Sequence, residues 1–435
     1  MVPPVERKRF WGLLAAASLI VLYSCDKPGQ NGNETERPAE KTEETILQKK
    51  SLKRGVSFNL AAYPDNDIPL LGAGCSWSYN WGSSTTAQAM SLFSRYGMDY
   101  CPMAWNASWD EDALRRFKAS YPECRYILAY NEPNLKDQAN MTPATAAKDW
   151  PRLVRIAKEL EMKIIAPAMN YGTLSGYSEP WKWLDEFFAQ PGVSIDDVDG
   201  IAVHCYMSHP SAMKWFIDEF KRYGKPVWLT EFCSWEGNIS EKDQIRYMIE
   251  ALHILEADED VFRYAWFIPR TDEESPCHNN LLEAPGKGLK PLGKIYVHMS
   301  TLDKSLWYRP GDVIPAEHYT GYSGSIDLSP TSDISGNLQI SGLGTGNAVE
   351  YQIELEEEGA YAIDLRYNSD AVSQLEFRLD GKSLGRFQLP NTYISWRNHR
   401  IIMTMPEGRH TLSMSCTETS QAKINWLRII KEEKE

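Results

Sequence analysis

The sequence has little positive charge for its size. Its 46 lysines and arginines are outnumbered by 59 acidic residues, which gives a net charge of −13. No basic cluster follows the N-terminal run Arg7-Lys8-Arg9. Proteins that bind polyanions present a basic patch or stripe. The composition therefore argues against nucleic acid as a partner.

The N-terminal hydrophobic run, Phe10 to Tyr23, is too short to span a membrane convincingly. It follows the basic residues and ends in Leu-Tyr-Ser-Cys, which resembles a bacterial lipobox with Cys25 as the lipidated residue. We therefore expect residues 1–25 to be a lipoprotein signal peptide. Acyl chains would anchor the protein to a membrane of a bacterial envelope, at the outer membrane or the cell surface. A plain signal peptide or an anchor helix is the alternative.

Residues 26–50 contain no aromatic side chain and are rich in Glu, Lys, Thr, Gly, Asn and Pro. Such a segment cannot bury a core, so we predict a flexible linker.

Cysteine and histidine are scarce. The eight cysteines leave seven besides Cys25, and their spacings match no zinc site. Cys205 and Cys233 lie on strands that we expect to be neighbours, so they could pair, although buried free thiols are an equal alternative. His204 and His209 are close in sequence but have no third ligand nearby. We therefore predict no metal site and no cofactor.

The length of 435 residues favours two domains. Between residues 51 and 305, short apolar runs alternate with amphipathic stretches such as Ala144 to Leu160 and Lys242 to Glu256. The predicted strands are 55–59, 75–81, 99–105, 126–132, 163–169, 200–206, 226–232 and 264–270. Eight such units predict a (β/α)₈ TIM barrel. A doubly wound sheet is the alternative, but the first strand, GVSFN, lacks a glycine-rich phosphate loop.

The pattern changes to strict alternation beyond residue 310, as in Tyr351, Ile353 and Leu355. Asp380-Gly381 is a hairpin signal between two alternating runs. We predict an antiparallel β-sandwich over 310–435.

Polar and aromatic side chains gather where the predicted barrel strands end, which is where the chemistry of a TIM barrel lies. Glu132 closes the fourth strand and Glu231 lies near the end of the seventh. Two such carboxyl groups can face one substrate, and cleavage of a glycosidic bond needs an acid and a nucleophile or base. Their proximity would raise the pKa of one of them. A single glutamate in this position could instead cap a helix or pair with a lysine, but two beside aromatic residues favour catalysis.

The ordered motifs KRGVSFN, CSWSYNWG, CPMAWN, YNEPN with QANMTPATAAKDWP, AVHCY and VWLTEF resemble glycoside hydrolase family 128. That resemblance covers residues 53 to about 300 and implies a retaining β-1,3-glucanase. It implies that Glu132 is the acid/base and Glu231 the nucleophile. It also implies a set of residues that bind the sugar or position Glu231: Asn131, His204, Tyr206, Trp266, Trp77, Tyr79, Trp81 and Trp105. Core packing is the alternative for each aromatic residue.

The C-terminal motifs IPAEHYTG, AVEYQIELEEEGAYAIDLRY, YISW and KINWLRI resemble carbohydrate-binding module family 6. By that resemblance Tyr351 and Tyr393 would hold a sugar ring between them. Lys423 and Asn425 depart from the family pattern, and a packing domain without a ligand is the alternative.

Together these features predict a monomeric enzyme whose partners are a polysaccharide substrate, a β-glucan, and a lipid anchor. The alternatives are a surface glycan-binding lipoprotein without activity and a hydrolase of another β-glycan.

Overall fold

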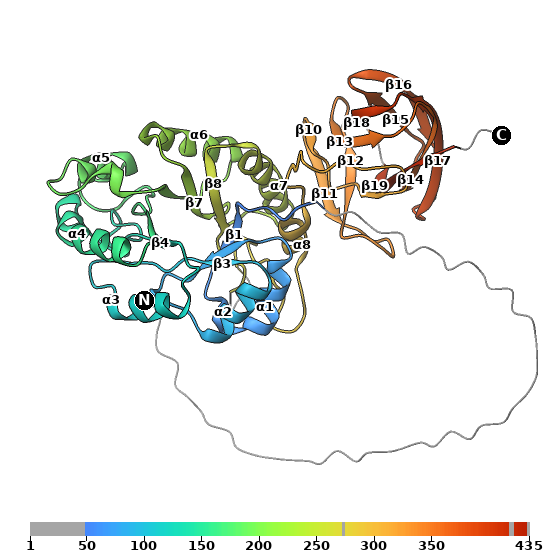
Figure 1. The fold of residues 1–435 in the computed structure, drawn as a ribbon. Helices are drawn as coiled ribbons and strands as arrows, with labels where there is room; N and C mark the ends of the chain where they lie inside the picture. The colour runs from blue at the N-terminus through green and yellow to red at the C-terminus, as the bar shows by residue number, and fades with distance from the viewer. Residues whose placement is uncertain (1–47, 272–274, 417–421, 433–435) are drawn as a thin grey trace, which may run out of the picture. The chain divides into compact units, whose positions relative to one another are not determined.

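The computed structural model describes residues 48–271, 275–416 and 422–432 (Figure 1). The predicted signal peptide, Cys25 and nearly all of the predicted linker lie outside these ranges. Within them, no helix is both long and apolar enough to cross a membrane.

The first part of the described chain alternates strands and helices, as the sequence predicts (Figure 1). The strands are β1 Arg54–Ser57, β2 Trp77–Tyr79, β3 Asp99–Tyr100, β4 Tyr126–Leu128, β5 Lys163–Ile165, β6 Ile201–Cys205, β7 Val227–Phe232 and β8 Val261–Trp266. Each overlaps one of the eight predicted strands and is shorter than predicted.

The helices of this part are α1 Pro64–Gly72, α2 Ala87–Arg95, α3 Glu111–Ser120, α4 Pro143–Glu159, α5 Pro180–Phe188, α6 Pro210–Phe220, α7 Glu241–Ala257 and α8 Pro291–His298, with short 3₁₀ turns at Leu60–Ala62, Ile195–Asp197 and Lys221–Tyr223. Side-chain caps begin several of them: Thr142 accepts from the Thr145 amide before α4, and Ser240 from the Asp243 amide before α7. Helix α4 continues through Pro151 without a break.

All strand pairs of this part are parallel. The ladders give a six-stranded order β3-β2-β1-β8-β7-β6 and a separate pair, β4-β5. Isolated parallel bridges, Met103 to Leu128 and Ile165 to Gly200, connect the pair to β3 and β6. A parallel α/β core is therefore established.

Side chains on one face of these strands form a compact inner core. It contains Trp77, Tyr79, Cys101, Met103, Tyr126, Leu128, Ile165, Ala168, Ala202, Trp228 and Ala265. Large inward side chains fill the space between parallel strands in such folds. The polar residues needed for chemistry therefore lie beyond this layer, at the strand ends.

The second part contains two antiparallel sheets. Its strands are β9 Val313–Pro315, β10 Gly321–Ser323, β11 Ile326–Pro330, β12 Leu338–Leu343, β13 Ala348–Leu355, β14 Gly359–Asn368, β15 Ser373–Leu379, β16 Lys382–Leu389, β17 Arg397–Met405, β18 Gly408–Cys416 and β19 Lys423–Lys431. The sheet orders are β10-β13-β18-β15-β16 and β11-β12-β19-β14-β17, and β9 pairs with β19. The predicted hairpin is confirmed: Asp380 and Gly381 join β15 to β16 with φ values of 49° and 79°.

Cys205 and Cys233 are both free and buried. The possible Cys205–Cys233 disulfide is therefore absent, and buried thiols, the other alternative, are correct. Burial raises the pKa of Cys205 to about 11, which keeps this thiol protonated.

A buried arginine ties β1 to two helices. Arg54 is fully buried; it donates to Glu256 of α7 at 2.8 Å, to the Tyr264 hydroxyl at 3.0 Å and to the Tyr296 carbonyl of α8 at 2.6 Å. A buried charge is tolerated only when its partners are all in place.

We expect Arg54→Met to lower the free energy of unfolding by about 3–5 kcal/mol, because Glu256 is left buried without a counter-charge. Denaturant melts would measure this loss. The double variant Arg54→Met/Glu256→Leu should recover much of it, and Arg246→Met, on an exposed pair with Asp243, should change stability by no more than about 0.5 kcal/mol. A double variant no better than Arg54→Met would contradict this account.

Candidate active site

Two buried glutamates face each other at the carboxyl ends of the strands. Glu132 follows β4 and Glu231 lies in β7; they are 6% and 4% exposed. One oxygen of each, together with a ring nitrogen of His204, lie within 4.8 Å of one another. Strands four and seven therefore bring the predicted pair together.

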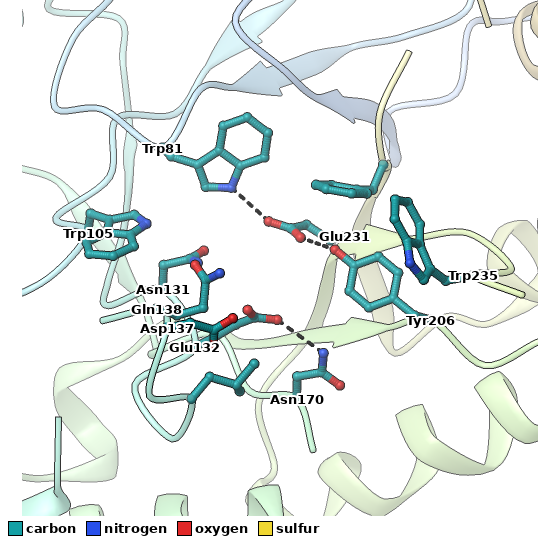
Figure 2. A pocket seen from close by; sticks show the side chains of 12 residues that line it. Trp81, Trp105, Asn131, Glu132, Asp137, Gln138, Asn170, Tyr206, Glu231 and Trp235 are labelled. Carbon is teal, nitrogen blue, oxygen red and sulfur yellow. Dashed lines mark hydrogen bonds between the residues drawn. The ribbon is translucent and has the colours of Figure 1, made fainter. Parts of the chain in front are cut away.

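Three donors hold the Glu231 carboxylate. Trp81 Nε1 donates to Oε1 at 2.8 Å and Tyr206 OH donates to Oε2 (Figure 2). Tyr79 OH also donates to Oε1, at 2.8 Å. Burial and the charge of Glu231 raise the pKa of both tyrosines, so their hydroxyls remain protonated donors. The carboxylate is thus fixed in one orientation.

Glu132 shares its Oε1 between two donors, the His204 Nδ1 at 2.9 Å and the Asn170 amide nitrogen at 3.1 Å. Burial acts to raise the pKa of Glu132, but these two hydrogen bonds and the His204 charge outweigh it and lower the pKa. Glu132 is therefore held as a carboxylate by its neighbours.

His204 of β6 lies between the two carboxylates. Its Nδ1 is 2.9 Å from Glu132 Oε1 and 3.4 Å from Glu231 Oε2. Burial acts to lower the pKa of this fully buried ring, but the charge of Glu231 and the bond to Glu132 raise it above 6.5. The histidine supplies the positive charge that lets two acids lie so close together.

The glutamates line a pocket of about 690 Å³. Figure 2 shows them on facing sides, with Trp105 and Trp235 at opposite ends of the view. The lining residues are Trp81, Trp105, Asn131, Glu132, Leu135, Asp137, Gln138, Asn170, Tyr206, Glu231, Trp235 and Phe267. Flat rings with a few convergent polar groups suit a ligand with apolar faces and polar edges, as a sugar has.

Two of the tryptophans predicted to contact the sugar, Trp266 and Trp77, do not line the pocket. Trp266 is fully buried on the helix side of β8, against Tyr247 and Tyr296, and its indole donates to the Asn279 carbonyl. Successive residues of a strand face opposite sides, so the following residue, Phe267, lines the pocket instead. Trp77 is fully buried in the inner core and donates to the Lys53 carbonyl.

The other predicted residues are at the site. Trp81, Trp105, Asn131 and Tyr206 line the pocket. Tyr79 does not line it but holds Glu231 from the inner core. Asn131 donates to Gln138 at 3.2 Å, and its buried Oδ1 has no hydrogen-bond partner among the described residues.

Sequence reasoning missed Asn170, Gln138, Trp235 and Phe267. Asn170 follows the fifth predicted strand, KIIAPAM, by one residue, so the rule that chemistry lies at strand ends could have found it. Phe267 lies in the eighth predicted strand beside Trp266, so strict alternation could have found it. Gln138 and Trp235 lie in loops whose course the sequence does not indicate.

The backbone is strained where two site residues leave their strands. Trp81 and Glu132 have φ values of 61° and 43°, which residues other than glycine seldom adopt. Such strain occurs at functional sites when the surrounding structure enforces it.

In the second part, the predicted ring pair is not formed. Tyr351 is fully buried in β13 and its hydroxyl donates to the Ala316 carbonyl, so it is a core residue. Tyr393 is 80% exposed in the loop before β17. Tyr351 obeys the alternation of its strand, which places it inside.

Glu132, His204 and Glu231 are also close enough to hold a metal ion. His209 precedes α6 and is not in this group. That no metal or cofactor takes part remains a prediction from the sequence.

Comparison with known proteins identifies the first part. A family model described as glycosyl hydrolase catalytic core matches residues 55–296, which is more than half of the chain. The chain belongs to this family. The protein is therefore a glycoside hydrolase. A second model, carbohydrate binding module (family 6), matches residues 315–431 of the hydrolase.

Solved structures and a curated protein resemble the hydrolase. An endo-β-1,3-glucanase of GH128 subgroup II from Pseudomonas viridiflava is 40% identical, with a TM-score of 0.52 over 57% of this chain and 98% of that chain. A second subgroup II endo-β-1,3-glucanase, from Sorangium cellulosum, is 32% identical, with a TM-score of 0.49 over 56% and 97% of the chains. Alkali-sensitive linkage protein 1 of Schizosaccharomyces pombe is 27% identical over 259 residues, 56% of this chain. The hydrolase spans 44% of the length of that curated relative.

We expect Trp81→Phe and Tyr206→Phe each to lower kcat by about 10- to 100-fold, because each removes a hydrogen bond to the Glu231 charge and keeps a ring. Steady-state kinetics would measure this on a glycan that the hydrolase cleaves. Trp105→Phe is the matched control: it lines the pocket, and the described residues show no bond from it to either glutamate. An equal fall of kcat in all three variants would mean that ring shape, not the donors to Glu231, is what matters.

Proposed function

We propose that the protein hydrolyses β-1,3-glucan with retention of the anomeric configuration, by two displacements. The observation that carries the mechanism is the short separation of the two glutamates. Retaining enzymes place their carboxyl groups about 5–5.5 Å apart, whereas inverting enzymes leave about 6.5–9.5 Å for a water molecule. Oxygens within 4.8 Å support the retaining arrangement.

In the first displacement, a Glu231 oxygen attacks the anomeric carbon as the glycosidic bond breaks, and the leaving oxygen takes a proton from Glu132. In the second, water attacks the glycosyl-enzyme, Glu132 takes a proton from it, and Glu231 is released. Trp81, Tyr79 and Tyr206 aim the Glu231 carboxylate. The unpaired Asn131 oxygen is placed to accept from a sugar hydroxyl.

The proton for the first displacement comes from the His204–Glu132 pair. Because the pKa of His204 is raised and that of Glu132 lowered, the proton rests on the histidine, 2.9 Å from Glu132 Oε1. A bound sugar excludes water, and exclusion of water disfavours both charges. Substrate binding therefore favours transfer of the proton from Nδ1 to Glu132, which becomes the acid.

The substrate is proposed from similarity. The glucanase from Pseudomonas viridiflava, 40% identical over almost its whole length, is named an endo-β-1,3-glucanase. We extend that linkage and an endo mode of cleavage to this hydrolase. The family 6 match supports a sugar-binding role for the second part, with Tyr393 rather than Tyr351 as its accessible ring.

Three further features belong to the proposal. The parallel bridges between β3 and β4 and between β5 and β6 support a closed eight-stranded barrel. The basic residues, short apolar run and Cys25 support a lipid anchor on a bacterial envelope. That the protein is a monomer stays a prediction from the sequence. The proposed domain limits, 51–305 and 310–435, contain the ranges of the two family models, 55–296 and 315–431.

We expect Glu231→Ala and Glu132→Ala each to lower release of oligosaccharides from soluble β-1,3-glucan by about 10³-fold or more. Glucan binding should survive in Glu231→Ala. Azide, a small nucleophile, distinguishes the roles: with Glu132→Ala and a substrate with a good leaving group it should yield the β-glycosyl azide, and with Glu231→Ala the α-anomer.

Early-time NMR of the parent's products should show the β-anomer first. An α-anomer would exclude retention. No products from the parent, with glucan still bound, would support a binding protein, and products from another β-glycan alone would correct the linkage.

We expect kcat/KM to fall as the pH rises through the raised pKa of His204, which lies above 6.5, because the His204–Glu132 pair then loses its proton. In His204→Gln the proton can rest only on Glu132. The alkaline limb should then shift, because it reports the pKa of Glu132 alone, which burial raises once the two His204 contributions that lower it are gone. A pH–rate profile of each form measures the limb, and an unmoved limb in the variant would show that another group supplies the proton.

A further inference from the structure

A group of aromatic rings outside the pocket is not used by the mechanism. Tyr171 follows β5, Trp181 lies in the first turn of α5, and Trp215 lies on α6. Tyr171 and Trp215 are 42% and 46% exposed, and Trp181 is partly exposed. The ring centroids of Tyr171 and Trp181 are 6.0 Å apart, and those of Trp181 and Trp215 are 6.4 Å apart. We call these three residues the outer aromatic cluster.

The outer aromatic cluster begins at Tyr171, the residue that follows Asn170 of the pocket. Asn170 lines the pocket and donates to Glu132 at 3.1 Å (Figure 2). Its side-chain oxygen accepts from the Tyr171 amide at 2.8 Å. A single side chain therefore bonds to the proposed acid and to the backbone of Tyr171, the first residue of the cluster.

The loop that carries Tyr171 is held in place. The Asn134 carbonyl accepts from the Thr173 and Leu174 amides at 3.1 and 2.8 Å, and the Asn134 side chain donates to the Asn170 carbonyl at 2.7 Å. A Cβ atom at Gly172 would lie 2.3 Å from the Tyr177 carbonyl oxygen, so the chain passes too closely for any other residue. These contacts fix the backbone on both sides of Tyr171, and a binding surface needs such a fixed position.

Packing alone does not account for the exposed rings. Tyr171 does pack on buried Phe216, with centroids 5.7 Å apart, and this explains one of its faces. Nearly half of Trp215 nevertheless stays in water. Contiguous exposed aromatic rings beside a ligand pocket mark an extension of the binding surface.

We propose that the outer aromatic cluster binds the glucan chain where it leaves the pocket on the side of Glu132. This inference rests on the proposed function. Glu132 gives its proton to the leaving oxygen, so the sugars that continue past Glu132 belong to the leaving part of the chain. The cluster therefore raises the efficiency of cleavage of long chains over short ones.

The test compares kcat/KM on the shortest β-1,3-gluco-oligosaccharide that the protein cleaves with that on long soluble β-1,3-glucan. Trp215→Ala should lower the long-chain value about three- to tenfold and leave the short-chain value nearly unchanged, because one stacked ring is lost. Tyr171→Ala/Trp215→Ala should lower the long-chain value further. Trp215→Phe should restore most of it, since it keeps a flat ring.

The matched control is Phe262→Ala, a ring 41% exposed near the start of β8, at the opposite end of the strands from the pocket. It should not change the ratio of the two values. An equal fall of short- and long-chain values in Trp215→Ala would overturn the inference in favour of a structural role. If neither kcat/KM value changes in Trp215→Ala, the inference is overturned as well.

A binding measurement separates this inference from the proposed function. The measurement is affinity electrophoresis in gels that contain different β-glycans, and it compares Glu231→Gln with Glu231→Gln/Trp215→Ala. At least one glycan should slow the migration of Glu231→Gln more than that of the double variant. If β-1,3-glucan is not cleaved but another glycan shows this difference, the proposed substrate is wrong and the cluster is still a subsite. If no glycan shows it, the inference is wrong whatever the activity.

Discussion

The structure of the site depends on keeping two carboxylates charged and close together out of water. An unpaired buried charge is costly, and two of the same sign are costlier. His204 makes the arrangement possible, because its Nδ1 lies 2.9 Å from one carboxylate and 3.4 Å from the other. Neutral hydrogen-bond donors stabilise the negative charge that His204 does not balance. They are one indole, two phenols and one amide.

The origin of these donors explains why a set of parallel strands is a suitable frame for the site. Tyr79 and Trp81 come from β2 and the residues after it, Glu132 and Asn170 follow β4 and β5, and His204, Tyr206 and Glu231 come from or follow β6 and β7. No single element could surround a carboxylate from so many sides. Parallel strands end at the same edge, so residues distant in sequence meet there without any long loop.

Features that depend on a residue pattern, such as strands and turns, could be predicted from the sequence. The direction in which a strand side chain points could not. The eight strands, the Asp380-Gly381 hairpin and the two glutamates follow from apolar runs, turn chemistry and motifs. The predictions that place Trp77, Trp266 and Tyr351 in a ligand site are wrong. An aromatic residue in a strand can pack in the core or line a pocket, and the residue type alone does not distinguish the two. Side-chain direction could have been inferred from strict alternation. The ladders, however, shift register between Val203 and His204 and between Leu229 and Phe232, beside His204 and Glu231. Such irregularities have no signature in one sequence, and they decide which side chain faces the pocket.

The positive φ values of Trp81 and Glu132 could not be predicted from the sequence either. A positive φ in a residue other than glycine costs on the order of 1–3 kcal/mol, so the fold must hold it against a more relaxed alternative. At Glu132 the holding contacts are identifiable: its amide donates to the Ala168 carbonyl at 3.1 Å, and its carboxylate is bound by His204 and Asn170. At Trp81 the indole is bound to Glu231. Each strained residue is therefore fixed through the partner that gives it a role in the site, and relaxing the backbone would break the bonds that orient the pair. At these two positions the backbone strain and the geometry of the glutamate pair are therefore one constraint.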